Sequence, residues 1–244
     1  FFKQKTAYEI SACLVGSEMC IRDSFDSHNI NIWPLELDNL KIANKTINEW
    51  NHECGNQFKF KYSWDLLNII NEIFSVLDFR MTQNSKVLLD ETGKIIVDSS
   101  TKILPGVYIE GQVTIGENCK IGPNCYLRGP VSIGNHSHIG QAVEIKNSII
   151  GSKTSIGHLS YVGDSIIGNN VNFGAGTITS NLRHDKRHHQ TMVDGDLIST
   201  DRRKLGAIIG NGARTGINTS FYPARKMGPC TTTTPGMIVT KDIH

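Results

Sequence analysis

Residues 103–145 read ILPGVYIEGQVTIGENCKIGPNCYLRGPVSIGNHSHIGQAVEI, and this stretch decides the fold. An aliphatic residue returns at every sixth position, and the fifth residue of each six is small or β-branched. A fixed short period indicates a solenoid, whereas a helix repeats at about 3.6 residues and a lone strand at about 2. The first positions are Ile103, Ile109, Ile115, Ile121, Leu127, Ile133, Ile139 and Ile145, and the fifth positions are Val107, Val113, Cys119, Cys125, Val131, Ser137 and Val143.

Each six residues are expected to form one short strand and a corner. The first and fifth residues would face a narrow interior, and the glycine that often comes second would supply freedom at the corner. The pattern resembles the hexapeptide repeat of the left-handed parallel β-helix acyltransferases. We therefore predict a mainly β fold, a single-stranded left-handed parallel β-helix with a short helical N-terminal segment. The left hand is implied by the resemblance, because parallel crossovers are otherwise right-handed.

The six-residue period is interrupted in two ways, by shortened steps and by an insertion. It shortens to five residues between Ile145 and Ile150 and again between Val162 and Ile167, so the short steps bracket residues 157–164. After Leu182 it stops, and it resumes at Ile209. The insertion at 183–206 is rich in Arg, Lys, His and Asp and is expected to project from the coil. Projecting loops on a rigid scaffold often carry function.

The rest of the chain divides into two parts before the β-helix, which is predicted to span 97–244. Residues 1–24 resemble a translated sequencing adapter and are treated as a non-native leader. Residues 25–96 are predicted to be irregular, with a helix that begins near an N-cap at Ser63. That helix would serve in packing or oligomer contact, or would cap the first coil. Its apolar stripe is Leu66, Leu67, Ile70, Ile73, Phe74 and Leu77.

The composition limits which binding partners and which cellular compartment are expected. The formal net charge of +2 carries no signature of nucleic-acid or anionic-membrane binding. No apolar run is long enough to predict a membrane span. The six cysteines include no CxxC pair, and Cys119 and Cys125 occupy interior positions of the repeat. A reducing compartment is therefore expected, and we predict a cytoplasmic protein.

His158 and two cations are the candidate chemical groups. The imidazole of His158 occupies the third position of its repeat, which points away from the interior, and it is suited to take a proton near neutral pH. Arg128 and Lys146 both occupy second positions, so they are expected on one side of the coil. Two cations on one face suit a ligand that carries phosphate.

Three runs make the resemblance specific: EIKNS (144–148), GHLSYVGD (157–164) and NFGAGTITSN (172–181). They are similar to the acetyltransferase domain of the bifunctional N-acetylglucosamine-1-phosphate uridyltransferase/glucosamine-1-phosphate acetyltransferases. The resemblance implies an acetyl-CoA-dependent N-acetyltransferase acting on an amino-sugar 1-phosphate, with glucosamine 1-phosphate as the expected acceptor, in nucleotide-sugar biosynthesis. It also implies a homotrimer with sites between chains. No Gly-rich phosphate loop followed by Thr-Arg occurs near the start, so no nucleotidyltransferase activity is expected in this chain.

The resemblance also implies residue roles. His158 would be the general base, and no metal is predicted for acetyl transfer. The amino-sugar phosphate would be held by Arg128, Lys146, Tyr161 and Asn172. Acetyl-CoA would lie along Ala175, Asn181, Leu182, Ile217 and Thr234.

Departures from that family leave the acceptor open. The bacterial enzymes follow the Asn with Tyr-Asp-Gly, whereas this chain reads NLRHDKR at 181–187 and is similar there to archaeal-type sugar-1-phosphate nucleotidyltransferases with an acetyltransferase tail. Two other classes stay open. One is a non-catalytic β-helix scaffold or regulatory subunit. The other is a γ-type carbonic anhydrase with zinc between subunits, for which the available histidines are His136, His138, His158, His184, His188 and His189.

Overall fold

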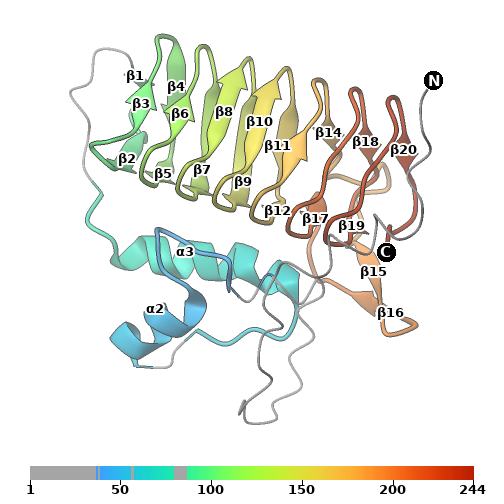
Figure 1. Ribbon diagram of the computed structural model, residues 1–244. Coiled ribbons are helices and arrows are strands. Elements are labelled where there is room, and N and C mark those ends of the chain that lie inside the picture. The colour runs from blue at the N-terminus through green and yellow to red at the C-terminus, as the bar shows by residue number, and fades with distance from the viewer. Residues whose placement is uncertain (1–36, 38, 56–57, 80–86) are drawn as a thin grey trace, which may run out of the picture.

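The computed structural model describes residues 37, 39–55, 58–79 and 87–244. Their main body is a parallel β-solenoid (Figure 1). The leader predicted at 1–24 lies outside the described residues. The helices are α2 (Ile47–Cys54), the 3₁₀ turn η3 (Ser63–Asp65) and α3 (Leu66–Val76). The strands are β1 (Val87–Leu89), β2 (Lys94–Val97), β3 (Lys102–Ile103), β4 (Val107–Glu110), β5 (Gln112–Ile115), β6 (Lys120–Ile121), β7 (Tyr126–Ile133), β8 (His138–Gln141), β9 (Glu144–Ile150), β10 (Ser155–His158), β11 (Tyr161–Gly163), β12 (Ile166–Ile167), β13 (Asn172–Phe173), β14 (Ile178–Thr179), β15 (Gln190–Val193), β16 (Asp196–Ser199), β17 (Ala207–Ile209), β18 (Ser220–Phe221), β19 (Arg225–Met227) and β20 (Ile238–Val239).

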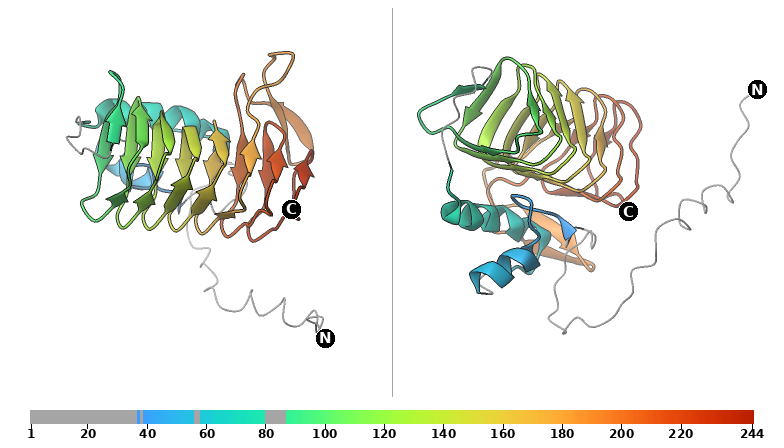
Figure 2. Two further views of the ribbon diagram at one scale, coloured as in Figure 1. Left: turned by 90° about the horizontal axis from the view of Figure 1, so that it is seen from above. Right: turned by 60° about the vertical axis from the view of Figure 1, so that its left-hand side comes forward.

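The coils stack so that equivalent strands pair in parallel, which gives three sides (Figure 2). We call the stack β1-β4-β7-β9-β11-β14-β18-β20 the first side and β3-β6-β8-β10-β13 the second side. The third side is formed by β2, β5, β12, β17 and β19, together with the second halves of β7 and β9, which turn a corner. This arrangement confirms the predicted parallel β-helix, and its left hand stays a prediction from the family resemblance.

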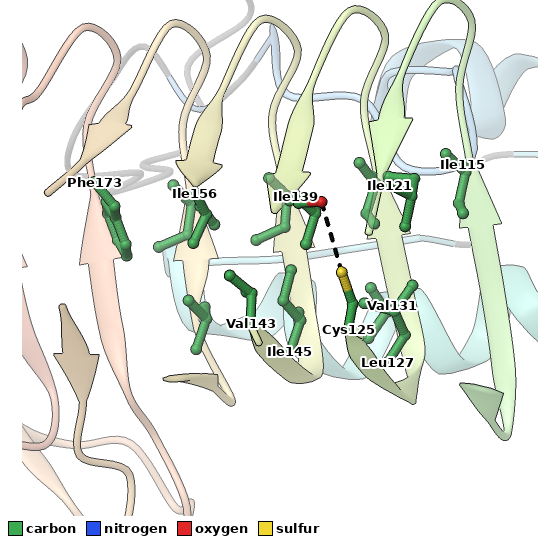
Figure 3. Packing of buried hydrophobic residues seen from close by; sticks show 14 of the residues in the cluster. Ile115, Ile121, Cys125, Leu127, Val131, Ile139, Val143, Ile145, Ile156 and Phe173 are labelled. Carbon is green, nitrogen blue, oxygen red and sulfur yellow. Dashed lines mark hydrogen bonds between the residues drawn. The ribbon is translucent and has the colours of Figure 1, made fainter. Parts of the chain in front are cut away.

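The interior is filled by the residues that define the period. All the first and fifth positions named above are buried, and so are Ile209, Phe221, Met227 and Val239 beyond the insertion. Figure 3 shows these side chains packed between the sides of the coil, with the thiol of Cys125 near the Ile139 carbonyl oxygen. Burial raises the pKa of the Cys125 thiol to about 12, so this cysteine is an unreactive core residue, as predicted.

Coil pairing begins earlier in the chain than the boundary predicted at residue 97. Strand β1 pairs in parallel with β4, and β2 pairs with β5. Val87 and Ile95 are buried in the same interior cluster as the later coils. The turn between β1 and β2 interrupts the six-residue spacing, so the repeat pattern does not reveal this part of the coil.

Helix α3 packs along the third side rather than over the open end of the first coil (Figure 1). Its buried residues share a cluster with Ile149, Ile166 and Ile208, which point outward from β9, β12 and β17. The helix therefore acts in packing, one of the two roles expected for it. Ser63 is not the N-cap of α3 but the first residue of η3. The Asp65 carboxylate accepts hydrogen bonds from the backbone N–H groups of Lys61 and Tyr62 at 2.9 and 2.8 Å.

The insertion is a docked hairpin. Its base is closed by an antiparallel bridge between Leu182 and Lys204, and β15 pairs with β16. The Thr191 hydroxyl donates to the Ala224 carbonyl oxygen at 3.2 Å, and the Lys226 ammonium donates to the Met192 carbonyl oxygen. Within the described ranges, none of the helices has the length and apolar character that crossing a membrane requires.

Candidate functional site

The two five-residue steps stack at one corner between the first and third sides. Lys146 lies in register with Gly163, and the next residues, Asn147 and Asp164, both adopt the left-handed conformation. The Asp164 N–H donates to the Lys146 carbonyl oxygen at 2.8 Å. The Gly206 N–H donates in turn to the Asp164 carbonyl oxygen, also at 2.8 Å. The short steps thus form the corner at which the insertion returns to the coil.

A buried carboxylate lies at this corner. Asp164 is 3% exposed, and its two oxygens accept the amide hydrogens of Asn147 at 2.7 Å and Asn181 at 2.6 Å. The Asn181 amide also donates to the Tyr161 hydroxyl at 3.1 Å. Burial and the Asp164 charge raise the pKa of Tyr161 above its ordinary value. The phenol therefore stays protonated as a hydrogen-bond donor near neutral pH.

Because Gly163 has no side chain, there is room beside its backbone for the end of the Tyr161 side chain. A Cβ at Gly163 would lie 2.4 Å from the Tyr161 hydroxyl oxygen and 2.8 Å from the Asn181 amide nitrogen. The Tyr161 side chain therefore leans along β11 toward the corner, away from His158.

The two predicted cations lie beside each other on the first side. Arg128 on β7 is in register with Lys146 on β9. Arg128 donates to Glu144 at 3.1 Å and to Glu110 at 3.4 Å, so two carboxylates already pair with its guanidinium. The pKa of Lys146 lies below its ordinary value because of burial and because the Lys204 ammonium is close. The insertion thus brings a further cation, Lys204, to the predicted pair.

His158 lies at a different place, at the end of β10 on the corner between the second and first sides. Its side chain is exposed, and its carbonyl oxygen accepts from the Gly176 N–H at 3.2 Å. Equivalent hydrogen bonds place Ala175 and then Ile217 at the same corner of the following coils. Thr234 stacks beside Gly216 in the next coil. His158 therefore belongs to a column of corner residues, with Gln141 before it and Ala175 and Ile217 after it. Thr234 lies beside this column, so three of the five residues predicted to lie along acetyl-CoA are in the column or next to it.

The other predicted site residues do not join that column. Asn181 belongs to the Asp164 group, and Leu182 is 40% exposed at the rim of a cavity of about 740 Å³ that Ile178 and Tyr222 also line. Asn172 is exposed on β13 of the second side, in register with Ser155. One chain therefore presents the predicted substrate residues on two sides of the prism.

Several residues of the site were not expected from the sequence. Asp164 lies inside the run at 157–164 and could have been suspected, because it falls within the second five-residue step. Asn147 occupies the same place in the other short step. Glu110 and Glu144, the partners of Arg128, and Lys204 carry no local signal, because strand register and the path of the insertion bring them here.

Within the described residues, the structure holds no group of three His, Cys, Asp or Glu side chains arranged to bind a metal ion. The carbonic anhydrase alternative placed its histidines between subunits, so a single chain does not test it.

Comparison with known proteins identifies the family. The sequence model of the GMPPB C-terminal domain matches residues 91–181. A bifunctional sugar-1-phosphate nucleotidylyltransferase/acetyltransferase of Sulfurisphaera tokodaii is 42% identical over 185 residues, 74% of this chain and 45% of that protein. A bifunctional protein GlmU of Methanococcus maripaludis is 38% identical over 212 residues, 85% of this chain and 49% of that protein. A putative uncharacterized acetyltransferase, YaiX of Escherichia coli, is 35% identical over 159 residues, 65% of this chain and 69% of that protein.

The repeat fold and these matches define a hexapeptide-repeat acyltransferase. More narrowly, the chain matches the acetyltransferase part of GlmU-type bifunctional sugar-1-phosphate nucleotidyltransferase/acetyltransferases. The chain spans about half the length of the two bifunctional relatives.

Proposed function

We propose that the protein is an acetyl-CoA-dependent N-acetyltransferase that acts on an amino-sugar 1-phosphate, with glucosamine 1-phosphate as the first choice. The observation that carries this proposal is the position of His158, exposed at the same corner as Ala175 and Ile217 and three residues before Tyr161. A base, an exposed column of corner residues and a face that carries cations thus lie on consecutive parts of the coil. Production of an acetylated amino-sugar phosphate would feed nucleotide-sugar biosynthesis.

The exposed corner column suits an extended thioester. Ile217 is 53% exposed, and Ala175 is small, so a narrow chain can lie across successive coils without displacing packed side chains. Acetyl-CoA would supply the activated acetyl group. We assign Ala175, Ile217 and Thr234 to this ligand, and Asn181 and Leu182 to the part of it that passes the base of the insertion.

The proposed reaction is direct acyl transfer. The amine nitrogen of the sugar forms a bond to the thioester carbonyl carbon, and His158 takes a proton from this amine as the bond forms. The carbon–sulfur bond then breaks, and the coenzyme leaves as a thiol after accepting a proton. Holding both reactants at one edge supplies the orientation that such a two-substrate reaction needs. No covalent enzyme intermediate and no metal are required.

The placement of Asn172 supports a site shared between chains. Asn172 faces outward from the second side, whereas Lys146 and Tyr161 belong to the first side. If these residues bind one substrate, they must come from neighbouring chains, as they would where a first side meets a second side in a homotrimer. We therefore propose a homotrimer with its sites between subunits.

The test is thiol release from acetyl-CoA with glucosamine 1-phosphate, galactosamine 1-phosphate and glucosamine as acceptors. We expect the 1-phosphates to be used far better than the free amino sugar, because the cationic face recognises phosphate. His158→Ala should lower kcat by about 10²- to 10⁴-fold, the usual contribution of a general base. A folded wild-type protein that releases no thiol with any acceptor would favour the scaffold alternative.

A further inference from the structure

The insertion brings Lys204 against the cationic face of the coil. Leu182 and Lys204 form a backbone bridge, and the next residue, Leu205, donates its N–H to the Asn181 carbonyl oxygen at 3.0 Å. Gly206 then stacks on Asp164. The position of the Lys204 backbone is therefore fixed by three consecutive contacts with the coil. Asp164, on which Gly206 stacks, is itself hydrogen-bonded to the Lys146 backbone, so this path brings Lys204 close to Lys146.

Two ammonium groups that lie near each other repel, and an anion bound between them offsets that repulsion. Across the ranges that the structure describes, neither Lys146 nor Lys204 forms an ion pair with a carboxylate. The Asp164 carboxylate attracts Lys146 from nearby, but it forms no ion pair with it, and its two oxygens accept amide hydrogens from Asn147 and Asn181. The lysine pair thus has the composition of an anion site rather than of a structural ion pair.

A second observation points in the same direction. Lys204 lines a cavity of about 260 Å³ together with two further cations, Arg202 and Arg203, and two carboxylates, Asp164 and Asp201. The Nε atom of Arg202 is buried and has no hydrogen-bond partner among the described residues. A buried donor without a partner is costly, so a ligand that accepts hydrogen bonds in this cavity would relieve the cost.

We propose that Lys204 and Lys146 together bind the dianionic phosphate of the sugar 1-phosphate, with Lys204 acting as a specificity-determining residue supplied by the insertion. A phosphate monoester carries close to two negative charges near neutral pH, which matches two ammonium groups. The Tyr161 hydroxyl on the same corner adds a neutral donor. The identity of the sugar rests on the proposed function, whereas the phosphate site does not.

Direct binding tests the site without acetyl transfer. Isothermal titration calorimetry would use the full chain with glucose 1-phosphate, which has no amine to acetylate, and separately with glucose and with inorganic phosphate. The variants are Lys204→Gln, Lys204→Arg and the control Lys102→Gln. The control removes the same charge from an exposed lysine on β3 of the second side.

We expect glucose 1-phosphate to bind and glucose not to bind. Lys204→Gln should weaken glucose 1-phosphate binding by about 10- to 100-fold, the usual loss for a hydrogen bond to a charged group. Lys204→Arg should retain most of the affinity, and Lys102→Gln should bind like the wild type. Inorganic phosphate that binds as tightly as glucose 1-phosphate would show that the sugar is not recognised, which would overturn the specificity role.

Equal affinity in Lys204→Gln and the wild type, or an equal loss in the Lys102→Gln control, would overturn the proposal. Thermal unfolding of each variant shows whether a loss of binding comes from loss of the fold, and Lys204→Arg keeps the test decisive if the Gln variant unfolds. Wild-type binding of glucose 1-phosphate without any thiol release would reject the proposed function and leave the phosphate site standing.

Discussion

At the scale of single residues, the site depends on a glycine as much as on charged groups. The Tyr161 hydroxyl, the Asn181 amide and the Asp164 carboxylate form one hydrogen-bonded chain over Gly163. Each of these side chains is fixed by the next, so the hydrogen-bond donors of the proposed substrate site would be held in place before a ligand binds. Preorganisation of this kind lowers the entropy lost when substrate binds.

Gly163→Ala should disturb this chain without unfolding the coil. The new methyl group would press on the far ends of the Tyr161 and Asn181 side chains, which can move, rather than on backbone. We expect the KM for the amino-sugar phosphate to rise by about tenfold, equivalent to the loss of about one hydrogen bond. The matched variant Gly157→Ala, whose Cβ would meet nothing within 4 Å, should keep the wild-type unfolding temperature. An unchanged KM in Gly163→Ala would show that the Tyr161 position does not matter for binding.

At the scale of elements, the third side of the coil needs α3 because its outward residues are apolar. Ile149, Ile166 and Ile208 each precede an interior isoleucine, so these strands are apolar on both faces. The doubled isoleucines are visible in the sequence and indicate a covered side. What covers it is not visible, because the contact joins segments far apart in the chain.

Ile73→Ala in α3 should lower the free energy of unfolding by about 2 to 5 kcal/mol, because it leaves a cavity between helix and coil. Ile73 is fully buried in that contact. Glu72→Ala, on the exposed face of the same helix, should change the free energy of unfolding by less than about 0.5 kcal/mol. Urea unfolding of the two variants checks this. Equal small effects would mean that the coil is stable without the helix.

The docked insertion should make stability depend on pH through His189. The side chain is 2% exposed, and its Nε2 atom lies 3.0 Å from the Asn181 carbonyl oxygen, to which a neutral ring can donate. Burial, with added repulsion from Arg183 and Arg225, holds the pKa of His189 below its ordinary value. Below about pH 6.5 the unfolded chain therefore binds a proton at His189 that the folded chain does not bind. The contribution of His189 to the free energy of unfolding is thus fully present above that pH and falls as the pH is lowered.

Unfolding free energies measured from pH 7.5 to pH 5 in the wild type and in His189→Gln give the test. The wild type should lose more stability over this range than the variant, whose residue 189 does not titrate. Parallel curves would show that His189 is not protonated on unfolding, and would contradict the buried neutral ring.

At the scale of the whole molecule, the sequence predicted the coil well because its period is local and was confirmed at every interior position named. It predicted less of the site. Asn147 and Asp164 are hydrogen-bonded only because the two five-residue steps stack on each other. Lys204 lies near this corner only because the insertion returns to the coil there. Helix α2 carried a readable signal, the Thr46–Glu49 capping box, which the six-residue pattern does not include.

Mixed assemblies test whether the site is shared between chains. Asn172→Ala and Lys146→Ala should each be nearly inactive alone, because each trimer site would lack one substrate contact. After co-refolding, some sites would take an intact second side from one chain and an intact first side from another. We expect thiol release to reappear in the mixture. A mixed trimer that stays inactive would place both residues in the site of a single chain.

Detection of the acetylated sugar phosphate is the sharpest test of acetyl transfer through His158. Glucosamine 1-phosphate and acetyl-CoA would be incubated with the wild type or with His158→Ala, and the sugar phosphate would be analysed by mass spectrometry alongside thiol release. We expect one acetyl group per sugar for each thiol released by the wild type, and a rate lower by about 10²- to 10⁴-fold in the variant. Equal rates in the two proteins, or thiol release without an acetylated sugar, would contradict this expectation.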